Sequence, residues 1–408
     1  MDLQLAQIFQ DPNWIKYASL PILAALVGWG TNWLAVKLTF YPLTFKGAAP
    51  FFGWQGVIPR KAEKMATIVV DRTISRFGDM DEVFKKLQPE KITDHIISQI
   101  EPRIEEYIDE IMYERQAILW DNLPESVKRK VYKWAKSQFP KRIESLVAEF
   151  GEELGSLIDV EALFVGELKK DPEIMVRIFQ EVGNKEFSFI IKSGFIFGLI
   201  LGAIQVPIWL HSGEFWLLPL FGFVVGFTTN WLALNFIFRP LYPRSFLGFN
   251  IQGLFLKRQN DVSDVWSKMV SEELITVEKV ADSMVNGRHA NRTRAIIQKH
   301  IRPVLDQAGI LKFIAQLTVG ANGYIELKEA LNDKAIEVSV DPFHDTSFNK
   351  SRSDVVAAAM SDRMRSLSPS EFQDVLRPAF QEEEWQLMLI GGVLGAAAGL
   401  VQYFIIFF

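Results

Sequence analysis

Four long windows without a charged residue constrain this chain most strongly. They cover residues 17–36, 193–210, 215–238 and 386–408 of a chain of 408 residues. An α-helix needs about 20 mostly apolar residues to cross the hydrocarbon core of a bilayer, and buried helices of soluble proteins are rarely so long and so bare of charge. We therefore predict an all-α membrane protein with four transmembrane helices.

A duplication organises these windows. Residues 21–43 resemble residues 219–241, and both copies contain the run Thr-Asn-Trp-Leu-Ala. The other two windows match as well, because Gly194, Gly198, Gly202 and Gln205 recur as Gly391, Gly395, Gly399 and Gln402. Internal similarity of this kind indicates repeated structural units. We predict two tandem, pseudo-symmetric hairpins of membrane helices, related by an axis along the membrane normal, each with a long soluble helical insertion.

The predicted domain boundaries follow from the windows and from the charged segments between them. In chain order we expect an N-terminal interfacial segment (1–16), a first membrane helix (17–41), a soluble helical domain (42–188), a second membrane helix (189–210), a short outer loop (211–214), a third membrane helix (215–239), a second soluble helical domain (240–385) and a fourth membrane helix (386–408). The alternation of Ile336, Val338 and Val340 predicts a small β element near 334–341. Apolar stripes at helical spacing elsewhere in the soluble segments favour a packed core, although a groove for lipid tails would use the same pattern.

Composition excludes several classes of function. The 44 basic residues are outnumbered by 49 acidic ones, which argues against nucleic acid as a partner. The absence of cysteine excludes disulfides and thiolate chemistry. The five histidines show no metal-binding spacing, and neither a phosphate-binding loop nor a nucleophile elbow is present. We expect no catalytic residues, no metal and no cofactor, and hence a protein that is not an enzyme, with a membrane-bound enzyme as the less favoured alternative.

The repeated motifs resemble a known family. The pattern Gly-x-x-Thr-Asn-x-x-Ala, the following Phe-x-Pro and the run Gly-Val-Ile-Pro-Arg-Lys at 56–61 look like the bacterial membrane-protein family filed as domain of unknown function 445. The segment 376–395 is similar to the end of its members. The resemblance implies a bacterial cytoplasmic (inner) membrane location and supplies no activity. Lys and Arg flank the soluble sides of the membrane helices, so we expect cytoplasmic soluble domains and both termini outside.

Three sets of residues are candidates for a functional role. The first is an intramembrane polar set, Thr31, Asn32, Thr229 and Asn230, which would either line a site for a lipid headgroup or small solute or hold helices together. The second comprises two basic pairs, Arg60-Lys61 and Lys257-Arg258, which would bind anionic headgroups or act as ordinary anchors on the cytoplasmic side. The third is the two glycine ladders at 194, 198, 202 and at 391, 395, 399, which predict close helix packing.

Two functions remain open at this point. The first is a non-enzymatic, membrane-anchored scaffold or organiser with helical arms, whose partner would be a cytoplasmic protein or a second copy of the chain. The alternative is a binder or transporter of a lipid or small amphiphile that uses the paired Asn residues. Membrane lipids are expected partners under both hypotheses.

Overall fold

The fold is seen in a computed structural model that describes residues 14–48, 52–73, 84–212, 214–246, 249–306, 310–377 and 384–407. It is almost entirely helical, and four of its helices are long and apolar enough to cross a membrane. These are α2 (Trp14–Phe40), α10 (Glu173–Ser212), α11 (Leu217–Phe238) and α20 (Glu384–Phe407). The prediction of an all-α protein with four such helices is confirmed. Of the predicted interfacial segment, 1–16, the first 13 residues lie outside the described part, and residues 14–16 begin α2.

The chain forms two compact units. Unit 1 draws on segments 1–73, 168–266 and 364–408, and unit 2 on segments 74–167 and 267–363. Parts of both predicted soluble segments, 42–188 and 240–385, belong to each unit. The physical reason is that helices from the two segments pack against one another, α8 against α15 and α7 against α16. The predicted boundaries stay a prediction.

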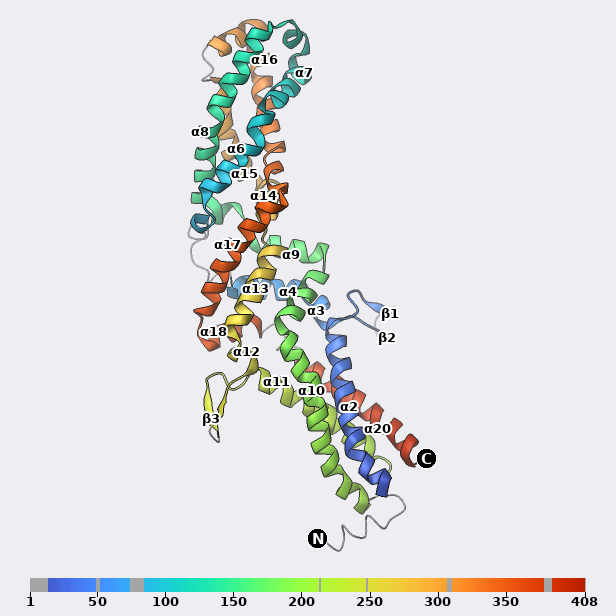
Figure 1. Ribbon diagram of the computed structural model, residues 1–408. Coiled ribbons are helices and arrows are strands. Elements are labelled where there is room, and N and C mark those ends of the chain that lie inside the picture. Colours follow the sequence, from blue (N-terminus) through green and yellow to red (C-terminus); the bar gives the residue numbers. More distant parts are fainter. Residues whose placement is uncertain are drawn as a thin grey trace. The chain divides into compact units, whose positions relative to one another are not determined.

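Unit 1 contains the four long apolar helices. Helix α2 packs along α10, α11 packs along α20, and further contacts join α10 to α11 and α2 to α20 (Figure 1). Their outward faces expose large apolar side chains, among them Ile196, Ile204 and Phe404, which are 57%, 52% and 60% exposed. Soluble proteins rarely expose apolar surface of this extent, whereas lipid tails solvate it without cost. The exposed apolar faces of these helices therefore support the membrane assignment made from the sequence.

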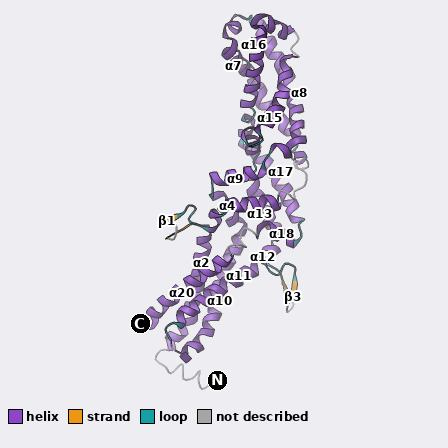
Figure 2. Cartoon of the chain, turned by 180° about the vertical axis from the view of Figure 1, so that it is seen from behind, coloured by secondary structure: helices purple, strands orange, loops and turns teal. Residues whose placement is uncertain are grey.

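Two small hairpins follow α2 and α11. Strand β1 (Lys46–Ala48) pairs with β2 (Phe52–Trp54), and β3 (Arg244–Phe246) pairs with β4 (Phe249–Ile251). Each helix ends before a proline, Pro42 or Pro240, and a glutamine side chain then donates to the carbonyl after that proline, Gln55 to Leu43 and Gln252 to Leu241. Figure 2 shows the hairpins on opposite sides of this unit. Short helices complete unit 1: α3 (Val57–Arg60), α4 (Ala62–Thr73), α12 (Leu254–Lys257) and α18 (Pro369–Leu376), with α13 (Gln259–Glu273) crossing the boundary between units.

Unit 2 is a helical bundle built from both soluble segments. It contains α6 (Pro89–Ile100), η2 (Glu101–Arg103), α7 (Ile104–Asn122), α8 (Glu125–Leu157), α14 (Val277–Asn286), α15 (Ala290–Asp306), α16 (Ile310–Glu337) and η3 (Asp341–His344). Most of α9 (Val160–Lys170) and of α17 (Thr346–Arg365) also belongs to it. The apolar stripes predicted from the sequence meet here, since buried residues of α8, α14 and α15 form one hydrophobic cluster.

The predicted β element near 334–341 is wrong. Residues up to Glu337 continue α16, and the chain then turns into the 3₁₀ helix at Asp341–His344. The helix is retained because Lys334 forms an ion pair with Glu110 of α7, while Val338 is buried against Ile100 and Ile104. Alternation over so few residues could not distinguish a strand from the end of a helix.

Candidate functional site

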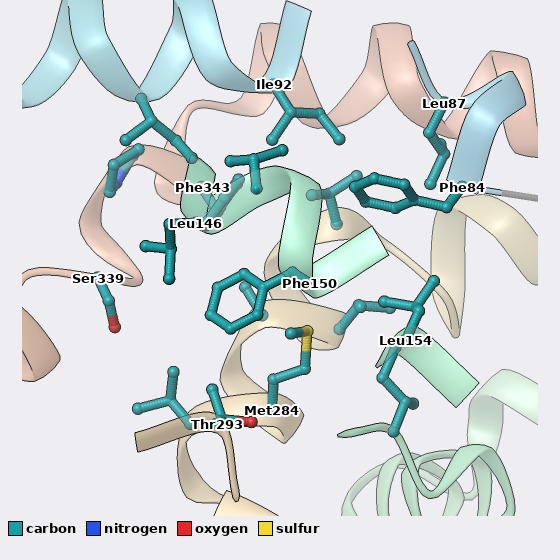
Figure 3. Close-up of a pocket in the computed structure, with 18 of the residues that line it drawn as sticks. Phe84, Leu87, Ile92, Leu146, Phe150, Leu154, Met284, Thr293, Ser339 and Phe343 are labelled. Carbon is teal, nitrogen blue, oxygen red and sulfur yellow. The ribbon is translucent and has the colours of Figure 1, made fainter. Parts of the chain in front are cut away.

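An apolar cavity of about 390 Å³ lies within unit 2 (Figure 3). Residues 84–87, α6, α8, α9, α14, α15, α17 and the segment that ends α16 and forms η3 all contribute to its wall. Protein interiors are otherwise close-packed, with few voids larger than a water molecule, and small-molecule pockets typically measure about 300–1,000 Å³. The space therefore has the size of a ligand site and is much larger than a packing defect.

The cavity wall comes directly from the helical periodicity of the sequence. Helix α6 contributes Ile92, Ile96 and Ile100 at intervals of four residues, which places them on one face. Helix α8 contributes a broader stripe, and α14 and α15 supply the opposite wall: Ile143, Leu146, Val147, Phe150, Leu154, Val280, Met284, Ile297 and Ile301. These faces pack together in part, as one hydrophobic cluster, and the remaining apolar side chains surround an open space.

The cavity is apolar but not sealed, because Lys86 and Arg363 in its wall reach solvent. Water inside it would meet few polar partners. An apolar occupant would displace that water and bury the wall, at roughly 25 cal/mol per Å² of apolar surface removed from water. The unit therefore has a thermodynamic reason to hold an apolar ligand.

Polar side chains in the cavity wall are few. Among its described residues only Lys86, Thr293, Ser339 and Arg363 carry a polar group, and none carries a carboxylate. Lys86 and Arg363 are exposed to solvent, whereas Thr293 is buried. The Ser339 hydroxyl donates to the carbonyl of Ile336 at 2.7 Å. The wall thus combines a hydrophobic interior with cationic groups at positions open to solvent.

Ion pairs join the two helices beside the cavity. Glu149 of α8 accepts hydrogen bonds from Lys299 and His300 of α15, each at 2.8 Å. These bonds hold the pKa of the Glu149 carboxyl below its ordinary value, with the Lys299 bond the largest cause. Arg292 also pairs with Glu153 at 2.7 Å. The α8–α15 contact is therefore fixed by charged groups outside the cavity, and the apolar residues inside it do not carry that contact alone.

The predicted intramembrane polar set is buried, and its described partners lie within unit 1. The Asn32 amide donates to the carbonyl of Ile190 on α10 at 2.8 Å, and its oxygen accepts a bond from the Thr229 hydroxyl at 3.3 Å. The Asn230 amide donates to the carbonyl of Leu387 on α20 at 2.9 Å. Thr31 bonds to the carbonyl of Val27 in its own helix. Asn32 and Asn230 thus each bond to the main chain of an adjacent helix, which is what residues that hold helices together do.

The glycine ladders lie at the same helix contacts. A Cβ added to Gly194 would overlap the main chain of Gly28, and one added to Gly391 would overlap that of Gly226. Gly198, Gly202, Gly395 and Gly399 likewise leave no room for a side chain. Glycine on one or both helices at each crossing lets the backbones approach this closely. A cavity in unit 1, lined in part by Thr39, Glu186 and Asn230, measures about 60 Å³, enough for water but not for a lipid.

The two basic pairs differ in their surroundings. Arg258 is bound to the buried carboxylate of Glu186, with both distances 2.7 Å. Arg60 donates to the side chain of Gln386 at 3.1 Å, Lys61 is half-buried, and Lys257 is exposed. Arg258 is therefore the counter-ion of the buried Glu186 carboxylate, a role that the sequence pattern alone did not reveal.

Its four long apolar helices make this chain a helical membrane protein. The names of the proteins that it matches describe the same class. It matches two proteins described as UPF0754 membrane proteins, from two strains of Staphylococcus epidermidis, each 26% identical over 111 residues. The match covers 26% of this chain and 30% of the length of each relative. No family model matches the chain, so the resemblance to domain of unknown function 445 is not confirmed. No solved structure matches it.

Proposed function

We propose that this protein is a membrane-anchored binder of an amphiphile, and that it holds the apolar chain of that amphiphile in the unit 2 cavity. The observation that carries the proposal is the cavity itself, about 390 Å³ of space walled by aliphatic and aromatic side chains. Binding would remove apolar surface of the ligand and of the wall from water, which stabilises the complex by about 25 cal/mol per Å². The proposal includes no catalytic step.

The surroundings of the cavity support an amphiphile rather than a fully apolar ligand. Lys86 and Arg363 lie in its wall and reach solvent, and the described wall has no carboxylate. An anionic headgroup would be attracted there while its chain occupies the interior. We place the four apolar helices in the bacterial cytoplasmic membrane and unit 2 on the cytoplasmic side, on the basis of the Lys and Arg residues that flank those helices.

The ligand site proposed here lies in unit 2 and does not include the intramembrane Asn residues. Their side chains already bond to other helices, and the cavity beside them is too small for an acyl chain. The scaffold hypothesis needs no ligand at all, so ligand occupancy separates the two functions.

A pair of adjacent substitutions on α17 tests the proposal. Ala359 lies in the cavity wall, whereas Ala358 is exposed. The full-length protein would be purified in a mild detergent, washed extensively, and its retained lipids quantified by mass spectrometry. We expect wild type and Ala358→Phe to retain a defined amphiphile at a constant molar ratio and Ala359→Phe to lose most of it. Equal retention by all three proteins, or none by wild type, would contradict the proposal and favour the scaffold.

A further inference from the structure

Thr293 of α15 carries a buried hydroxyl that finds no hydrogen-bond partner among the described residues. The residue is 1% exposed and belongs to the wall of the unit 2 cavity. Figure 3 shows its side chain near Met284, among apolar neighbours. A polar group that is buried and unpaired is unfavourable, so native structures rarely retain one without a reason.

The usual solution for a helical threonine is not used here. A Thr hydroxyl inside a helix can donate to the carbonyl four residues earlier, as Thr31 and Thr39 do in α2 at 2.8 and 2.9 Å. Ser339, the other hydroxyl in the cavity wall, donates to the carbonyl of Ile336. Within the described wall, Thr293 is thus the one buried hydroxyl whose proton remains unassigned.

We propose that the Thr293 hydroxyl donates to an ester carbonyl oxygen of the ligand, which makes the ligand an ester-linked acyl lipid. This inference rests on the function proposed above. A hydroxyl can both donate and accept, and we assign Thr293 the donor role, for which the ligand would supply the acceptor. A neutral carbonyl meets that need, whereas a free carboxylate would be buried beside Thr293 without a buried cation in the described wall, which is strongly unfavourable.

The ester also divides the ligand in a way that suits the wall. The acyl chain beyond the carbonyl would contact the apolar residues of α8 and α14, such as Phe150 and Met284. The part of the lipid on the other side of the ester would extend toward solvent, where Lys86 and Arg363 are exposed. Thr293 would then select for the linkage, and the two cations for the headgroup.

The test compares two lipids that differ only at the linkage. The probes are a radiolabelled monoacyl phosphatidylglycerol with a saturated hexadecanoyl chain and its ether analogue with a hexadecyl chain, each titrated onto delipidated full-length protein held in amphipol. The carbonyl offers one additional hydrogen bond, so wild type should bind the ester roughly five- to ten-fold more tightly than the ether. Thr293→Val should abolish this preference by weakening ester binding alone, and Thr293→Ser should retain it.

The outcomes separate this inference from the proposed function. Equal affinity of wild type for both lipids, or an undiminished ester preference in a folded Thr293→Val protein, would overturn the role of Thr293 and leave the cavity as a lipid site. Failure of wild type to bind either lipid would overturn the proposed function itself. The wild-type comparison needs no substitution, so it decides the inference even if the Val variant does not fold.

Discussion

Replacing Asn32 with alanine should weaken the packing of the membrane helices without affecting the unit 2 cavity. The substitution removes the bond from the Asn32 amide to the Ile190 carbonyl and the bond it accepts from Thr229. Side-chain hydrogen bonds between membrane helices are each worth about 0.6–1.7 kcal/mol. Loss of both should lower the free energy of unfolding by about 1–3 kcal/mol.

The assay is reversible unfolding of the full-length protein by sodium dodecyl sulfate in mixed micelles, followed by circular dichroism. Asn235→Ala is the matched control, because the Asn235 amide donates to the carbonyl of Trp231 in its own helix and to no other described helix. We expect that control to change stability by less than about 0.5 kcal/mol. If Asn32→Ala were as mild as the control and nevertheless lost its bound lipid, the packing role would be refuted and the intramembrane site favoured.

Three further predictions concern packing and charge. Gly28→Ala places a Cβ against the carbonyl of Gly194 and should destabilise by about 1–3 kcal/mol in the same assay, whereas Gly30→Ala, which has nothing within 4 Å, should be tolerated. Arg258→Gln leaves the buried Glu186 carboxylate without its counter-ion and should cost about 3–5 kcal/mol, part of which the double variant with Glu186→Gln should recover. The pKa of Glu149 is lowered by Lys299 and His300, so its contribution is present above the ordinary value of 4.5 and lost as pH falls below it. Thermal unfolding of Glu149→Gln should therefore depend less on pH than that of wild type between about pH 5 and pH 3, and equal acid sensitivity would contradict this.

The sequence predicts the membrane helices well because their signal is local. A window of about 20 apolar residues without charge has few alternatives to a membrane helix. The glycine ladders and the Thr-Asn-Trp runs similarly point to helix contacts, and the structure places Gly194 against Gly28 and Asn32 against the Ile190 carbonyl. The tandem repeat stays an interpretation of the sequence, although the contact of Asn32 with α10 has a counterpart in that of Asn230 with α20.

The cavity could not be predicted in the same way because it depends on contacts between distant segments. The stripes of α6 and α8 are visible in the sequence, but a stripe that fills a core and one that lines a cavity have the same periodicity. No sequence pattern marked Thr293, because its significance comes from having no hydrogen-bond partner among the residues that the structure describes. The prediction of a β element at 334–341 was wrong for a related reason. The ion pair between Lys334 and Glu110, which favours the helix, joins residues far apart in the chain.

Photolabelling tests the central claim, that unit 2 holds an acyl chain, most directly. Membranes containing the full-length protein would be loaded with a phospholipid that carries a diazirine near the end of its acyl chain, irradiated, and the labelled residues mapped by peptide mass spectrometry. The proposal predicts labels on the cavity wall, around Phe150 of α8 and Met284 of α14, in addition to the outer faces of the four membrane helices. It also predicts that Ala359→Phe removes the cavity labels and leaves those on the membrane helices unchanged. Labels confined to α2, α10, α11 and α20 would contradict the proposal.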